Sequence, residues 1–126
     1  MNPYDAAHRL SKALKESEEF KELKKAQEEL KADETAKTMV LDLRGKQMEL
    51  QRQRLSGIEV SEQQEQRLQK LMDVVNMNMV AKRFIEAEYR AIVLLQDVQK
   101  IIGEATGVIY DEELMNIADE SQGDQQ

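Results

Sequence analysis

Hydrophobic residues recur every three or four positions along most of the chain, a spacing that places them on one face of an α-helix. Segments with the alternating pattern of a β-strand are nearly absent. The predicted helices each follow a residue whose side chain can accept a hydrogen bond from a free backbone N–H, and these residues are Asn2, Ser17, Asp33, Ser61 and Asn78. The pattern therefore predicts an all-α fold with about five helices.

The boundaries of the middle helices carry the clearest signals. The helix after Asp33 is expected to end at Ser56–Gly57, because glycine suits the left-handed conformation that ends many helices. A tight connection follows, and Ser61 with Gln64 three residues later fits a capping box. The sequence around Asn76 and Asn78 offers two caps, and we expect a break there with Asn78 starting the last helix.

The last long helix, residues 79–105, is the most apolar. Its apolar arc consists of Ala81, Phe84, Ile85, Ala91, Ile92, Leu95, Val98 and Ile102. An arc this wide predicts a central position in contact with more than one neighbour. Leu94 and Ile101 lie on its flank and Val93 looks exposed, so we expect these three to form an interaction surface that a second copy covers in a homodimer.

Two polar residues, Glu88 and Gln99, fall within the apolar arc. Glu88 is open to two interpretations. It is either an acid–base catalyst, or a structural residue in a water-lined seam or paired with an arginine such as Arg44 or Arg67. The structural interpretation is favoured, because His8 is the only histidine and the chain has no cysteine. The sequence therefore predicts no catalytic, cofactor-binding or metal-binding residues.

Charge is distributed unevenly along the 126 residues. The net charge is −7, and residues 103–126 contain seven acidic residues and no basic one, so residues 1–102 are neutral. We expect one helical domain over residues 1–105 and a partly disordered acidic tail over 106–126, with disorder from Asp119 onward. The basic residues Lys21, Lys24 and Lys25 alternate with acidic ones, which favours a salt-bridged helix face over direct contact with RNA.

The beginning of the chain lacks the features of a signal peptide, and no segment has the roughly 20 apolar residues that cross a bilayer. We therefore expect a soluble protein with no membrane partner.

Several segments in order carry a family resemblance. They are Tyr4-Asp5-Ala6-Ala7, Ser17-Glu18-Glu19-Phe20-Lys21-Glu22-Leu23-Lys24, Ala32-Asp33-Glu34-Thr35-Ala36-Lys37, Phe84-Ile85-Glu86-Ala87-Glu88-Tyr89-Arg90 and Gln96-Asp97-Val98-Gln99-Lys100-Ile101-Ile102. Their order and spacing resemble the YlbF/YmcA family of small bacterial helical proteins, and most of all its YheA-type branch.

The resemblance implies an elongated helical bundle with a long helical hairpin, a cytoplasmic location and self-association. It also implies a non-enzymatic regulator of competence, sporulation and biofilm formation, linked to RNA processing and acting through contacts with other proteins. A direct RNA-binding accessory role is the alternative. Some relatives contribute cysteines to iron–sulfur clusters, but this chain has none, so no cofactor is expected.

Overall fold

The computed structural model describes residues 1–115 of the chain. The disorder predicted for residues 119–126 lies outside these residues. Within residues 1–115, all regular secondary structure is helical, which confirms the all-α prediction. The elements are α1 (Pro3–Glu16), α2 (Glu18–Lys31), α3 (Glu34–Leu55), α4 (Glu62–Met77), α5 (Met79–Thr106), the short 3₁₀ helix η1 (Gly107–Tyr110) and α6 (Glu112–Met115).

The five predicted helix starts are all confirmed. Each cap side chain accepts a hydrogen bond from the backbone N–H three residues later, and the capping residues are Asn2, Ser17, Asp33, Ser61 and Asn78. At α4 the side chain of Gln64 also accepts a hydrogen bond from the N–H of Ser61, at 2.9 Å, which completes the capping box. The helix starts are therefore properties of short local sequences.

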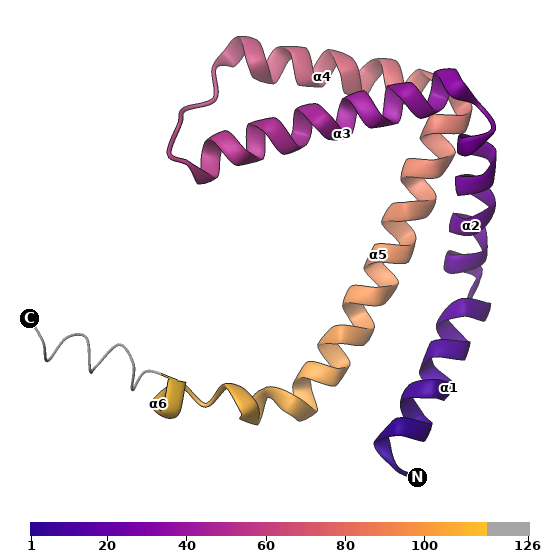
Figure 1. Cartoon of the computed structure of the whole chain (residues 1–126), viewed down its shortest axis with the longest axis vertical. Coiled ribbons are helices and arrows are strands. Elements are labelled where there is room, and N and C mark those ends of the chain that lie inside the picture. Colours follow the sequence, from indigo (N-terminus) through magenta and orange to yellow (C-terminus); the bar gives the residue numbers. More distant parts are fainter. Residues whose placement is uncertain (116–126) are drawn as a thin grey trace, which may run out of the picture. The chain divides into compact units, whose positions relative to one another are not determined.

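Helices α3 and α4 form the long hairpin that the resemblance implied (Figure 1). Between them Gly57 has a φ of 75°, a left-handed conformation that a residue with a Cβ adopts only at a cost. The N–H of Ile58 then donates a hydrogen bond to the carbonyl of Gln53 at 2.8 Å. These contacts end α3 and turn the chain into α4.

The chain divides into two compact units, Met1–Ala91 and Ile92–Gln126, and α5 contributes residues to both. The core of the first unit forms where α2, α3, α4 and the beginning of α5 meet. Its buried members are Ala26, Leu30, Ala36, Val40, Leu43, Val75, Ala81, Phe84 and Ala87. Four of these nine residues are alanines, which allow the helices to approach closely.

The predicted central burial of the whole apolar arc of α5 is wrong for its second half. Ala81, Phe84 and Ala91 are buried, but Ile92, Leu95 and Ile102 keep 45%, 38% and 48% of their surface accessible. Helical periodicity reports which face is apolar, and it does not report whether a neighbour covers that face.

The end of α5 matches the predicted end at residue 105 to within one residue. The helix continues through Gly103 to Thr106, and Gly107 begins η1. A single glycine inside a helix costs only about 1 kcal/mol, which neighbouring helix formers can offset. In the predicted acidic tail, Gly107–Tyr110 forms η1 and Glu112–Met115 forms α6, and residues 116–126 lie outside the described residues.

Candidate functional site

Glu88, the acidic residue in the apolar arc, forms an ion pair with Arg44 of α3. One guanidinium nitrogen of Arg44, Nη2, donates to the two carboxylate oxygens of Glu88. The guanidinium also lies over the ring of Phe84, 5.2 Å from its centroid, a cation–π geometry. Of the two arginines that the sequence offered as partners, Arg44 is the one that Glu88 contacts. The three side chains therefore connect α3 to α5 within the first unit.

Arg67, the other arginine, lies on the hairpin. It lines a hollow of about 120 Å³ together with Lys46, Glu49, Leu50, Gln64 and Leu68. Residues of α3 and α4 alone form this hollow, so Arg67 belongs to the surface of the hairpin.

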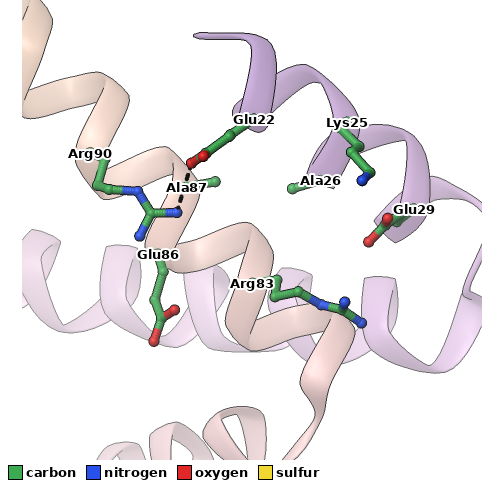
Figure 2. Close-up of a pocket in the computed structure, with 8 residues that line it drawn as sticks. All are labelled: Glu22, Lys25, Ala26, Glu29, Arg83, Glu86, Ala87 and Arg90. Atoms are coloured by element: carbon green, nitrogen blue, oxygen red, sulfur yellow. Dashed lines mark hydrogen bonds and ion pairs between the residues drawn. The ribbon is translucent and has the colours of Figure 1, made fainter. Parts of the chain in front are cut away.

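A charged groove of about 210 Å³ runs between α2 and α5 in the first unit (Figure 2). Its charged residues are Glu22, Lys25, Glu29, Arg83, Glu86 and Arg90. Arg90 donates to Glu22 across the groove at 3.1 Å, and the methyl groups of Ala26 and Ala87 point into the gap between the helices (Figure 2). Three acids face three bases, so the groove has no net charge to attract an ion. We interpret it as a solvated seam of ion pairs.

A second pocket, of about 220 Å³, has a different character. It is lined by Gln27, Leu30, Lys31, Lys37, Val40, Leu41, Arg44 and Phe84. We call it the basic pocket, because three of these residues are cationic and none is acidic. Sequence reasoning missed it, since its residues come from three helices. The only local signal was the position of Lys31 and Lys37 on either side of the turn between α2 and α3.

The interaction surface predicted from sequence lies in the second unit, on the latter part of α5. Val93 is 36% exposed, Ile101 is 64% exposed and Leu94 is half-buried. Gln99, predicted to lie in an apolar seam, is exposed. Ile92, Leu95 and Ile102 are exposed as well, and we refer to residues 92–95, 101 and 102 together as the α5 apolar surface.

Residues 1–115 contain no cluster of three or more His, Asp or Glu side chains placed to hold a metal ion. Among the same residues, no helix combines the length and apolar character needed to span a bilayer.

Within residues 1–115 the chain thus combines helices, a groove of opposite charges, a basic pocket and exposed apolar side chains on α5. The family model described as "Control of competence regulator ComK, YlbF/YmcA" matches residues 4–106. The chain belongs to this YlbF/YmcA family, as its segment order suggested.

Similar proteins are known in several bacteria. A UPF0342 protein of Alkalihalophilus pseudofirmus is 42% identical over 86% of this chain and 92% of its own length. A UPF0342 protein of Caldicellulosiruptor bescii is 38% identical over 94% of this chain and 98% of its own. A solved structure, a protein of unknown function (DUF964) from Bacillus stearothermophilus, superimposes with a TM-score of 0.73 at 26% identity, covering 86% of this chain and 96% of that one.

Proposed function

We propose that this protein is a non-enzymatic regulatory adaptor that works as a homodimer and presents helix faces to other regulatory proteins. The observation that carries the proposal is the α5 apolar surface. Five of its six members are each more than a third exposed in the single chain, and these are Ile92, Val93, Leu95, Ile101 and Ile102. Apolar side chains gathered on one part of a helix mark protein contacts more often than isolated ones do.

The family supports a regulatory role. Its description links it to control of the competence regulator ComK. The descriptions of this family and of the relatives named above refer to no reaction. A cytoplasmic location, membership of the YheA-type branch and a link to RNA processing belong to the same proposal, because the resemblance to the YlbF/YmcA family implies them.

The test is the mass of the full chain in solution. Light scattering coupled to size-exclusion chromatography at micromolar concentration should give twice the 14.6 kDa of one chain. In the double variant Leu94→Glu/Ile101→Glu the mass should fall to that of one chain. Two carboxylates would have to be buried without partners in the dimer, and burial of an unpaired charge is strongly unfavourable. Circular dichroism should show unchanged helicity, since neither side chain is fully buried in the single chain.

A matched control exists on α3. Met48 and Leu55 are 61% and 82% exposed and also lie seven residues apart on one helix. The variant Met48→Glu/Leu55→Glu should remain dimeric. A wild-type chain with the mass of a monomer would contradict the homodimer. A dimeric Leu94→Glu/Ile101→Glu variant would instead show that another surface forms the interface.

A further inference from the structure

The basic pocket combines a buried apolar floor with a cationic rim. Its floor is formed by Leu30, Val40 and Phe84, which are 8%, 2% and 5% exposed. These side chains come from α2, α3 and α5, the helices that share the core of the first unit. The floor is therefore held in place by the core, and a bound group would meet a preformed surface.

The cations on the rim differ in their partners. Arg44 is paired with Glu88. Lys31 and Lys37 form no ion pair with any side chain in residues 1–115. Because none of the residues lining the pocket is acidic, the two lysine charges favour a ligand that brings negative charge.

The size of the pocket limits the ligand. Pockets for cofactors and drug-sized molecules measure roughly 300–1,000 Å³. At about 220 Å³, the basic pocket suits one or two apolar side chains of a docked segment, with acidic residues beside them.

This chain contains a segment of that composition. Residues 107–115 include Asp111, Glu112 and Glu113 and no basic residue. Their five large apolar side chains are between 59% and 82% exposed, and these are Val108, Ile109, Tyr110, Leu114 and Met115. The carboxylates match the lysines of the pocket, and the apolar side chains match its floor.

We propose that the basic pocket binds residues 107–115 of a second copy of this chain, an inference that rests on the proposed homodimer. In a two-fold symmetric dimer the contact occurs twice, because each chain offers one pocket and one segment. The α5 apolar surface and the pocket contact would then contribute separately to the affinity. The electrostatic part of the pocket contact would weaken as salt concentration rises.

Charge reversal in the full-length chain tests the proposal. One variant, Lys31→Glu/Lys37→Glu, makes the pocket acidic, and another, Glu112→Lys/Glu113→Lys, makes the segment basic. Each variant alone places like charges opposite each other in both contacts of its homodimer. Sedimentation at low ionic strength should show that each variant has a dimer dissociation constant at least about tenfold above that of the wild type.

Mixing the two variants identifies the chain that supplies the segment. In the mixed dimer an acidic pocket meets a basic segment, and a basic pocket meets an acidic segment. The mixture should therefore form heterodimers with nearly wild-type affinity. Docking of the segment on its own chain would give no such recovery, and that result would overturn the proposal.

The control Lys12→Glu/Lys15→Glu carries the same change in net charge on exposed lysines of α1 outside the pocket. It should change the dimer dissociation constant less than about twofold. An increase as large as that of Lys31→Glu/Lys37→Glu would mean that net charge alone controls dimerisation, and would overturn the proposal. The proposal would also be overturned if Lys31→Glu/Lys37→Glu dimerised as the wild type does. The same holds if that variant dimerised normally but lost binding to a single-stranded RNA oligonucleotide at low salt.

The outcomes also separate this proposal from the proposed adaptor function. If Leu94→Glu/Ile101→Glu is monomeric while Lys31→Glu/Lys37→Glu dimerises normally, the pocket contact fails and the adaptor proposal stands. If the wild-type chain is a monomer in solution, both the proposed α5 contact and the proposed pocket contact are wrong.

Discussion

Arg44 makes two kinds of contact at once, because its guanidinium pairs with Glu88 and lies over the ring of Phe84. The side chains of Arg44 and Glu88 are 43% and 30% exposed, so water screens the pair only partly. The sequence singled out Glu88 as a polar residue in an apolar arc. It left the partner open, since Arg44 and Arg67 lie on different helices and only the packing of α3 against α5 selects between them.

A double-mutant cycle measures this contact. With Glu88→Gln and Arg44→Gln, urea unfolding should give a coupling free energy of about 1 kcal/mol, the upper part of the range for partly exposed pairs. The control pair, Lys46 and Glu49, is more exposed at 60% and 53% and should couple by about 0.3 kcal/mol. Equal coupling free energies in the two cycles would mean that partial burial and the ring of Phe84 add nothing to the coupling between Arg44 and Glu88.

Helix starts illustrate what short sequences decide at the scale of elements. The five caps and the capping box follow from side chains that satisfy backbone N–H groups three residues away. Such contacts do not depend on the rest of the fold. As the sequence predicted, α5 continues through Gly103, because the helix formers on either side offset the cost of one glycine.

The break between α4 and α5 gives a prediction at this scale. Asn78 accepts a hydrogen bond from the N–H of Ala81 at 3.0 Å, whereas Asn76 lies exposed within α4. Asn78→Ala should lower the free energy of unfolding by about 1 kcal/mol, as loss of a cap does. Asn76→Ala should leave it unchanged or slightly raise it, since alanine favours helix. Chemical denaturation compares the two, and an equal loss would contradict the assignment of the cap.

For the molecule as a whole, burial is uneven between the two units. The hydrophobic core belongs to residues 26–87, and the large apolar side chains of residues 107–115 are all exposed. A unit with few buried contacts is expected to open at low free-energy cost unless a partner covers it. The proposed dimer therefore predicts that the stability of the second unit, more than that of the first, rises with protein concentration.

Amide hydrogen exchange tests this prediction. In the wild type at concentrations that favour the dimer, amides of residues 92–106 should exchange slowly. In Leu94→Glu/Ile101→Glu they should exchange faster, while amides of α3 and α4 keep their protection. The variant Met48→Glu/Leu55→Glu serves as the control and should resemble the wild type over residues 92–106. A uniform increase in amide exchange rates along the chain would indicate global destabilisation instead of a lost interface.

The sequence by itself determined the helical class, the starts of the helices and the location of the negative charge, because each depends on residues close together in the chain. The family could also be identified, since segment order is a property of the sequence. Tertiary structure alone decided the partner of Glu88, the burial of only the first half of the α5 arc, and the basic pocket built by three helices. These features depend on which helix faces meet, and that is set by packing between distant segments.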